Sequence, residues 1–517
     1  MAIKKHMLLA TLFASLTWAF PKPPLGTAVN TTTCNGQTFV YEALAGYGFV
    51  PSNSRDKFGD TAGGFGSSAA IDQTSWKVDK SGVYSGILWA LPDRGWNTEG
   101  TLNFQPRIHK FAITFRPDYT STANDPSAPN LHLELLDTIR FTDPFGAPLT
   151  GLDADAHGPY LTFPGFPPLP SATYTGDGFG GNGVGGRRVS LDSEGLVLSP
   201  DGSFWVSDEY GPFIYHFAPS GRMLSAIQPP PALIPERNGT ESFSAASPPR
   251  YDPDLETLPK NNPTGRDNNQ GFEGLTVSHD NRNLYALMQS ALNQEGGLNS
   301  TTRVYTRLLH YDISNPFRPE YKAEYVLPLP KDPAGRVAAQ SEIHFVSPTQ
   351  FLVLARDSNR GHGQKNSDSR YRHVDVYDIS KATDIRGPAY DCPSCAVASV
   401  DGVLDSDIVP ATYCSWLDYN VNSQLNRFGL HNGGDQDAQL LNEKWESIAL
   451  AAVQPPEKGC IDGHPATNGE YFLFSLSDND FITQNGFMNG GELPYADASG
   501  YNLDNQVLVF KVKLPIP

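Results

Sequence analysis

Short apolar runs occur in pairs along this chain, and polar turns join the two members of a pair. In one pair, residues 194–198 (EGLVL) precede the turn Ser-Pro-Asp-Gly and residues 204–209 (FWVSDE) follow it. Runs of this length, bounded by turn-forming residues, predict two β-strands joined as an antiparallel hairpin. Comparable pairs occur at four other places: 67–71 with 87–93, 273–277 with 284–289, 342–346 with 351–357, and 446–450 with 471–478.

Further segments of alternating apolar and polar residues follow each pair, for example 307–313 and 324–329. Four antiparallel strands per repeat form the blade of a β-propeller. We therefore expect an all-β protein, a β-propeller of four-stranded blades. Five blades are counted directly, and residues 396–440 are irregular enough to contain a sixth.

The two ends of the chain are expected to meet in one blade. The last repeat ends with residues 506–512 (QVLVFKV) and has no fourth strand after it, whereas residues 38–47 (TFVYEALAGY) form a strand-like segment that no repeat precedes. If the N-terminal segment pairs with the last strand and completes the final blade, it closes the ring and removes an exposed sheet edge. Three long segments rich in Gly, Pro and Asn are expected to be loops on one face: 151–190, 229–270 and 410–440.

Composition and charge narrow the class of protein further. The 517 residues include 48 Gly and 43 Pro, and 39% of them are hydrophobic, which argues against both a helix bundle and a disordered chain. The formal net charge is −18. A field of this sign repels polyanions, so we expect no binding to nucleic acid and regard cations as the natural partners.

Residues 1–19 have the features of a secretory signal peptide, because basic residues precede an apolar run over 7–20 and prolines follow it. About fourteen apolar residues fall short of the ~20 that a membrane-spanning helix needs, so no stable membrane insertion is expected. We expect cleavage after Ala19, an N-terminal extension over 20–37, and a propeller domain over 38–517. The protein would then be secreted to the extracellular space.

Cysteines and sequons agree with an extracellular protein. The five cysteines are few for this length, so we expect local disulfides and a fold that depends on its core. Cys392 and Cys395 are expected to form a small structural bridge, and the odd number leaves one cysteine unpaired or bonded to another chain. Sequons at Asn30, Asn238 and Asn299 predict a glycoprotein.

Acidic residues recur at the same place in the repeated strand pairs. The start of the first strand and the end of the second lie at one end of an antiparallel hairpin, so Glu194 is expected near Asp208. If the first strand of each pair lines the propeller channel, carboxylates from different blades converge on one acidic mouth. This set consists of Asp93, Glu194, Asp208, Glu209, Glu273, Glu342, Asp357, Glu446, Asp478 and Asp480.

Such a mouth is unfavourable without cations, because two carboxylates ~4 Å apart repel by about 4 kcal/mol at an effective dielectric near 20. Hard oxygen ligands in this number suit calcium, so Ca²⁺ is the expected cofactor. The expected metal ligands are Glu194, Asp208, Glu209, Glu273, Glu342, Asp357, Glu446, Asp478 and Asp480.

Three arginines share the predicted loops of this mouth: Arg94, Arg266 and Arg356. Ion pairs are their default role, but an Arg fork beside bound cations also offers bidentate donors to a phosphoryl group. With Asp93, Glu194, Asp208 and Glu273, these arginines form the expected catalytic set. The chain contains no Gly-x-Ser-x-Gly, His-Glu-x-x-His or Walker motif, which leaves metal-assisted hydrolysis or no chemistry.

An ordered set of motifs resembles the secreted phytase-like family, which is described as the "esterase-like activity of phytase" domain, and in particular its fungal-type members. The resemblance covers residues 40–512, and its first strand pair departs from the pattern because Gly66 and Ser67 stand where Glu-Gly is expected. It implies a calcium-filled acidic mouth that binds phosphate and activates water. The motifs are Asp93-Arg94-Gly95, 192–196 (DSEGL), 207–212 (SDEYGP), 269–275 (NQGFEGL), 354–357 (LARD) and 477–481 (SDNDF).

The leading hypothesis is a secreted, calcium-dependent phosphoester hydrolase, phytase-like or phosphodiesterase-like, that acts as a monomer on a small phosphorylated substrate. One alternative is a non-catalytic propeller in which calcium rigidifies ligand-binding loops. Another alternative is a lactonase-like hydrolase on the same scaffold, in which one metal polarises a carbonyl.

Overall fold

Five antiparallel sheets form the blades, as the repeated strand pairs predict, and the described residues contain three further two-stranded sheets. A computed structural model describes residues 28–455 and 468–516. Blades 1 and 2 consist of β3 (Ser68–Val78), β4 (Tyr84–Leu91), β5 (Arg107–Phe115) and β6 (Leu131–Arg140), and of β9 (Ser193–Leu198), β10 (Phe204–Asp208), β11 (Ile214–Phe217) and β12 (Met223–Ile227). Blades 3 and 4 consist of β15 (Phe272–Val277), β16 (Asn283–Met288), β17 (Tyr305–Asp312) and β18 (Glu320–Pro328), and of β19 (Ala339–Ser347), β20 (Gln350–Arg356), β21 (Arg372–Asp378) and β22 (Thr412–Asp418).

Blade 5 joins the two ends of the chain. Its inner strand is split into β23 (Lys444–Trp445) and β24 (Ala449–Ala452), both paired with β25 (Glu470–Asp478), and β28 (Asn505–Lys513) follows. The N-terminal strand β2 (Gln37–Val50) pairs antiparallel with β28, and β1 (Asn30–Cys34) adds a further strand outside it. The predicted closure of the ring by an N-terminal strand is therefore confirmed, and β1 falls inside the stretch 20–37 that was expected to be an extension.

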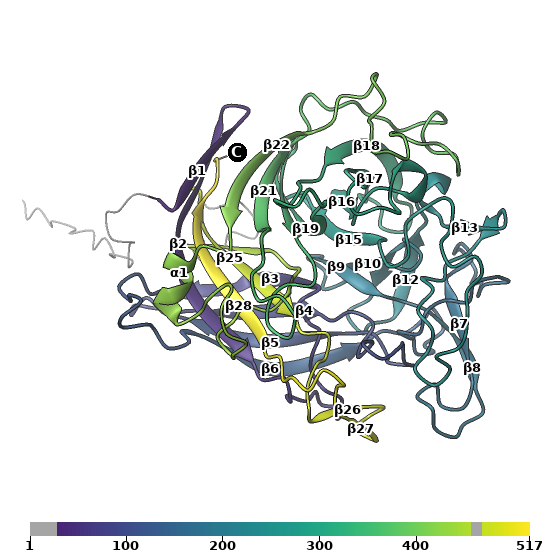
Figure 1. Cartoon of the computed structure of the whole chain (residues 1–517), viewed down its shortest axis with the longest axis horizontal. Helices are drawn as coiled ribbons and strands as arrows, with labels where there is room; N and C mark the ends of the chain where they lie inside the picture. Colours follow the sequence, from purple (N-terminus) through teal and green to yellow (C-terminus); the bar gives the residue numbers. More distant parts are fainter. Residues whose placement is uncertain (1–27, 456–467, 517) are drawn as a thin grey trace, which may run out of the picture.

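The inner strands surround a central channel. β3 contacts both β9 and β24, β9 contacts β15, and β15 contacts β19 (Figure 1). The described residues thus form a five-bladed propeller. The ring order follows the chain order, as expected when each blade is one repeat.

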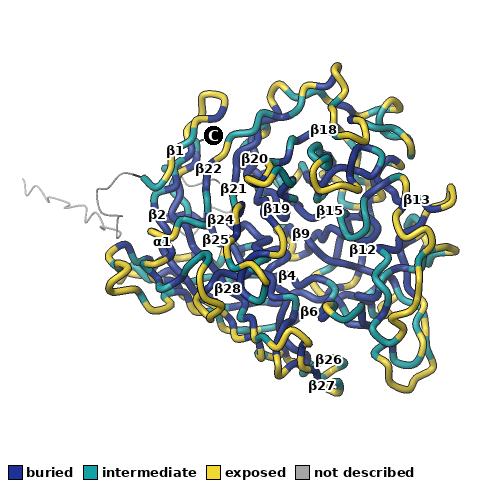
Figure 2. The backbone as a smooth tube through the Cα atoms, viewed as in Figure 1, coloured by how far each residue is buried: buried dark blue, intermediate teal, exposed yellow. Residues whose placement is uncertain are grey.

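The hydrophobic core consists of one cluster between each pair of neighbouring blades. Strand β10 shows why its sequence is apolar throughout: Phe204 and Val206 pack toward blade 1, whereas Trp205 packs toward blade 3. Successive side chains of a strand point to opposite faces, and both faces of a blade are covered here. Figure 2 shows the buried strands enclosed by exposed loops.

Residues 396–440 do not form a sixth blade, and the expectation that 410–440 is a loop was wrong for its first part. Strand β22 lies there and completes blade 4, followed by α1 (Asn422–Leu425) and η3 (Asn426–Phe428). Only Trp416 and Leu417 of β22 are buried, and the other five residues of the strand are partly or fully exposed. Its apolar pattern is therefore too weak to mark a strand.

The other two long segments are mainly loop, with small hairpins inside them. Residues 151–190 contain β7 (Ser171–Tyr174) and β8 (Gly186–Val189), and residues 229–270 contain η1 (Pro231–Leu233), β13 (Glu236–Arg237) and β14 (Thr240–Glu241). The remaining elements are η2 (Asn293–Glu295), β26 (Gly486–Met488) and β27 (Leu493–Tyr495). The described part of the chain has no helix with the length and apolar character needed to cross a membrane.

Two disulfides lie within the described residues, and one of them corrects the expectation of local bridges. Cys392 and Cys395 are bonded, as predicted, but Cys34 and Cys414 are bonded across 380 residues of sequence. The long-range bond joins β1 of blade 5 to β22 of blade 4, so it reinforces the closure of the ring. The spacing of cysteines cannot reveal such a pair, because the fold brings it together.

Some sequence predictions fall outside the described residues. These are the signal peptide 1–19, the first part of the extension 20–37, and Cys460. The three sequon asparagines lie within the described part of the chain, and each is exposed.

Candidate metal centre

Glutamates at the start of three inner strands face one mouth of the channel. Glu194 of β9, Glu273 of β15 and Glu446, which lies between β23 and β24, are only 6%, 3% and 4% exposed. In each blade the pairing with the second strand is irregular at this point. Bulges of this kind re-aim a side chain at the end of a sheet, which explains how three blades direct carboxylates to one place.

A first carboxylate triad consists of Asp192, Glu194 and Glu209, and one oxygen from each residue lies within 4.8 Å of the others. Asp192 and Glu194 are two residues apart at the start of β9, and Glu209 directly follows β10. The triad is therefore built by one end of the hairpin β9–β10. Asp192 was not among the predicted ligands, although its spacing of two residues from Glu194 was a usable signal.

Several buried oxygens of this region accept no hydrogen bond. They are both carboxylate oxygens of Asp192, Oε1 of Glu209 and Oε2 of the neighbouring Glu273. Arg94 Nη1 lies 2.9 Å from Asp192 Oδ2 as an ion pair. Buried polar atoms normally have hydrogen-bond partners, so oxygens without one in this number make the triad a candidate cation site.

The pKa values of the mouth carboxyls also reflect buried negative charge with too few partners. Burial raises the pKa of Asp192, Glu194, Glu209 and Glu273 above the usual range, and nearby carboxylates raise it further for the three glutamates. The Arg94 guanidinium opposes the rise at Asp192 and Glu209. Without a cation these groups therefore resist full ionisation.

A second triad consists of Asp93, Asp478 and Asp480, again with oxygens within 4.8 Å of one another. The ammonium of Lys444 lies 2.5 Å from Asp480 Oδ1 and 3.4 Å from Asp478 Oδ2. Sequence reasoning missed Lys444. It is two residues before Glu446 on the split inner strand of blade 5, and this spacing could have placed it at the mouth.

Glu342 lies apart from both triads. In blade 3 the extra residue of the bulge is Glu273, but in blade 4 it is Ser341, so Glu342 lies one position further along its strand. A shift of one residue redirects a side chain in a strand. The Glu342 carboxylate instead accepts hydrogen bonds from Ser68 Oγ, from Leu275 N at 3.1 Å and from Ile343 N at 2.9 Å.

Asp208 and Arg266 are both occupied by main-chain partners. Asp208 accepts hydrogen bonds from the backbone N–H groups of Asp192, Tyr210 and Gly211, at 2.9–3.1 Å. Arg266 donates to the carbonyls of Tyr210 and Phe243 at 2.7–2.9 Å. These two residues hold the loops behind the mouth, and neither was expected to do so.

Asp357 and Arg356 are also engaged. Asp357 accepts from Ser369 Oγ and from the backbone N–H of Arg370, both at 2.7 Å, within its own blade. Arg356 forms a buried ion pair with Glu446. Of the three predicted arginines, Arg94 is the one that pairs with the first triad.

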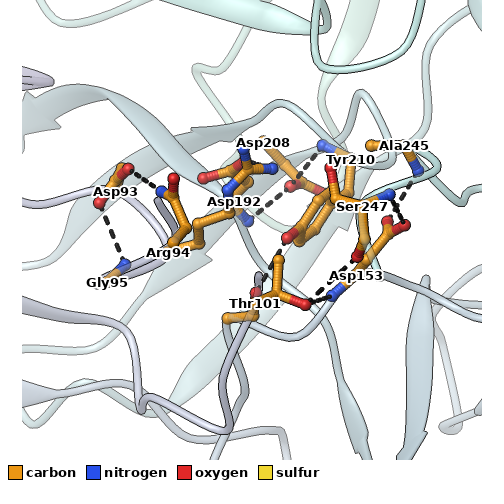
Figure 3. A network of polar contacts seen from close by, with 12 residues as sticks. Asp93, Arg94, Gly95, Thr101, Asp153, Asp192, Asp208, Tyr210, Ala245 and Ser247 are labelled. Carbon is orange, nitrogen blue, oxygen red and sulfur yellow. Dashed lines mark hydrogen bonds and ion pairs between the residues drawn. The ribbon is translucent and has the colours of Figure 1, made fainter. Parts of the chain in front are cut away.

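A cavity of about 310 Å³ adjoins Arg94. Its walls come from the loops 94–101 and 246–253. Asp153 shapes the second loop, because its carboxylate accepts from Ala245 N at 2.7 Å and from Ser247 N at 2.9 Å. Figure 3 shows the Arg94 side chain extending toward Asp192 and Tyr210. In the same view, Asp153 lies beside Ala245 and Ser247 of the second loop.

Fold and site together define a five-bladed β-propeller with a carboxylate-lined mouth. The profile of the family described as "Phytase-like: Esterase-like activity of phytase" matches residues 79–407. A protein of Arthroderma benhamiae (strain ATCC MYA-4681 / CBS 112371), named "Uncharacterized secreted protein", is 54% identical over 481 residues, covering 91% of this chain and 93% of the relative. The chain belongs to this phytase-like family.

Comparison with solved structures finds distant likenesses to other proteins. An N-acetylgalactosamine deacetylase from F. plautii has 8% identity and a TM-score of 0.30, covering 91% of this chain and 95% of that one. A gluconolactonase from Xanthomonas campestris has 8% identity and a TM-score of 0.26, covering 97% and 99%. At these TM-scores neither likeness carries an argument about this chain.

Proposed function

We propose that this protein is a secreted, calcium-dependent hydrolase of phosphoesters, with its reaction centre at the Asp192–Glu194–Glu209 triad. The observation that carries the proposal is the set of buried carboxylate oxygens without partners, next to Arg94 and a cavity of about 310 Å³. The description of the family supports an esterase-like activity. The name of the relative and the apolar N-terminal run support secretion.

The donor set fits a hard divalent cation. The triad offers only carboxylate oxygens, which calcium prefers, and Glu273 adds a further unpartnered oxygen beside them. Asp192, Glu194 and Glu209 would hold the ion. When bound, it would polarise a phosphoryl oxygen and lower the pKa of a water.

Arg94 is suited to bind the anionic part of a substrate. It lines the cavity, and its Nε donates no hydrogen bond within the described residues. A guanidinium with a free donor beside a cavity can orient an ester through one of its charged oxygens. Arg266 and Arg356 do not line this cavity, and they bind backbone carbonyls and Glu446, respectively, so we assign them the role of supporting the mouth.

Glu194 and Glu273 form a carboxyl pair that can hold a proton. Burial raises the pKa of both carboxyls above the usual range. The charge of Glu273 raises the pKa of Glu194 further, and the charges of Glu209 and Glu446 raise the pKa of Glu273. A carboxyl that retains a proton near neutral pH can serve as a general acid or base. Glu273 is the better candidate for this role, because Glu194 belongs to the triad.

A substrate panel tests the proposed function. Metal-free protein is assayed on a phosphomonoester, a phosphodiester and a lactone, with chelator and with added calcium. We expect phosphoester hydrolysis that requires calcium and falls at least 100-fold in Glu194→Gln. Glu134→Gln, which removes an exposed carboxylate on β6, is the matched control and should keep full activity.

Other results would contradict the proposal in specific ways. Hydrolysis of the lactone alone would favour a lactonase-like enzyme. Calcium binding without turnover of any substrate would favour the non-catalytic binding module. Phosphoester hydrolysis that persists in chelator would exclude the metal from the reaction.

A further inference from the structure

The two carboxylate triads at the mouth differ in how their oxygens are satisfied. In the second triad, Asp93 accepts from Gly95 N at 3.0 Å and from Asn97 Nδ2 at 2.9 Å. Asp478 Oδ1 accepts from Asp480 N at 2.7 Å. Lys444 Nζ then contacts Asp478 Oδ2 and Asp480 Oδ1. An ammonium and three hydrogen-bond donors thus already surround this triad.

The first triad has no comparable set of donors. Asp192 and Glu209 are 1% and 2% exposed, and three of their four carboxylate oxygens are buried without a hydrogen bond. Arg94 is the only guanidinium or ammonium that forms an ion pair with this triad among residues 28–455 and 468–516. The two triads thus have the same ligand chemistry, and a cationic side chain contacts each of them. They differ in that the first triad keeps buried carboxylate oxygens without a hydrogen bond, whereas no oxygen of Asp93, Asp478 or Asp480 is buried in that state.

We propose that the mouth binds a single divalent cation, at Asp192–Glu194–Glu209, and that the tethered ammonium of Lys444 occupies the second triad in place of another metal ion. This inference rests on the proposed function only for the presence of a metal at the first triad. It goes further by assigning the number of ions and the role of Lys444. A lysine placed in this way supplies positive charge to the mouth at any calcium concentration.

The ammonium of Lys444 lies between two acids of the second triad, 2.5 Å from Asp480 Oδ1 and 3.4 Å from Asp478 Oδ2. A divalent cation would have to displace this ammonium before it could bind Asp480. At the first triad it would share Asp192 with Arg94 and would meet Asp192 Oδ1 and Glu209 Oε1, which accept no hydrogen bond.

The test is the stoichiometry of calcium binding to the metal-free protein, measured by isothermal titration calorimetry. We expect one calcium ion per wild-type chain and two per chain in Lys444→Met, which keeps the length of the side chain and removes its charge. Lys322→Met is the matched control, because Lys322 also contacts two carboxylates but on the exposed surface of blade 3. It should bind one ion, like the wild type.

A second pair of variants keeps the inference testable if Lys444→Met does not fold. Asp480→Asn should still bind one ion, with a Kd within about threefold of the wild-type value. Asp192→Asn should lose the ion or bind it at least 100-fold more weakly. Circular dichroism and thermal unfolding verify that each variant is folded.

Several outcomes would overturn the inference. Two ions in the wild type, one ion in a folded Lys444→Met, or loss of an ion in Asp480→Asn would each contradict the role of Lys444 and leave the proposed function standing. No ion in the wild type would contradict both proposals. One ion in the wild type with no hydrolysis would contradict the proposed function alone.

Discussion

At the scale of single residues, Glu194 and Glu342 show that similar glutamates in neighbouring repeats have different tasks. The Glu342 carboxylate receives donors from β3, β15 and its own strand, through Ser68, Leu275 and Ile343. Ser68 Oγ also accepts from Leu196 N at 3.2 Å. Glu342 therefore links the inner strands of four blades across the channel.

We predict that Glu342→Ala lowers the free energy of unfolding by about 3 kcal/mol, because it leaves buried donors without an acceptor. Glu342→Gln keeps an acceptor for the two backbone donors and should lose less than about 1 kcal/mol. Urea unfolding in calcium and in chelator measures both variants. The loss should be the same in the two conditions, and a loss confined to calcium would instead place Glu342 in the metal site.

The raised pKa values predict how stability depends on pH. Burial raises the pKa of Asp208 to about 7, and the pKa values of Glu194 and Glu273 also lie above the usual range. In the folded state these groups bind protons that they release in the unfolded state, so their stabilisation is full below about pH 4 and is lost as pH rises through the folded pKa. Asp208 therefore loses its contribution to stability between about pH 4 and about pH 7.

We predict that metal-free protein becomes less stable between about pH 5 and about pH 8, and that Glu194→Gln flattens this slope because it removes one raised carboxyl. Saturating calcium should also flatten the slope, since it stabilises the ionised form. Urea unfolding at several pH values gives the slopes. Equal slopes for the wild type and Glu194→Gln without metal would show that Glu194 ionises normally.

At the scale of elements, β-bulges decide which side chains reach the mouth. The strand pairs themselves follow from apolar runs and turns, so all five pairs and the closing strand were predictable from the sequence. A bulge depends on how two strands register, and blade 4 places its extra residue at Ser341 where blade 3 has Glu273. This one-residue difference is why Glu342 was grouped with the mouth glutamates.

The candidate site was predictable to a similar extent. Glu194, Glu209 and Glu273 were expected at the mouth, and the structure brings them together there. Asp192 and Lys444 were missed because the prediction was based on the repeated glutamates and did not include the residues two positions before them. The partners of Asp208 and Arg266 are backbone groups of loops, which no local pattern encodes.

The two disulfides close loops of very different length, which gives a prediction about their effect on stability. Cys34–Cys414 closes a loop of 380 residues, whereas Cys392–Cys395 spans only three. A longer loop constrains the unfolded chain more, so replacing Cys34 and Cys414 by Ser should cost about 3–5 kcal/mol of stability. The same change at Cys392 and Cys395 should cost clearly less, and chemical unfolding of the two double variants provides the comparison. An equal or larger loss in the second variant would contradict a role of the long-range bond in closure.

At the scale of the whole molecule, contacts between the blades stabilise the fold, whereas repulsion between the carboxylates of the mouth destabilises it. Five apolar clusters between blades stabilise the ring, and the N-terminal strand leaves no open joint between the first and last blades. The mouth concentrates like charges that the ring holds in place. A cation that binds there relieves this repulsion and should stabilise the entire propeller.

Thermal unfolding of the metal-free protein by calorimetry, with and without calcium, tests directly whether calcium binds at the carboxylate mouth. A ligand that binds only the folded state stabilises it by about 2.7 kcal/mol at a concentration of 100 Kd. We predict that calcium raises the Tm of the wild type and of Glu134→Gln, and that this rise is lost in Glu194→Gln. Unfolding curves of the wild type that coincide with and without calcium would contradict the account.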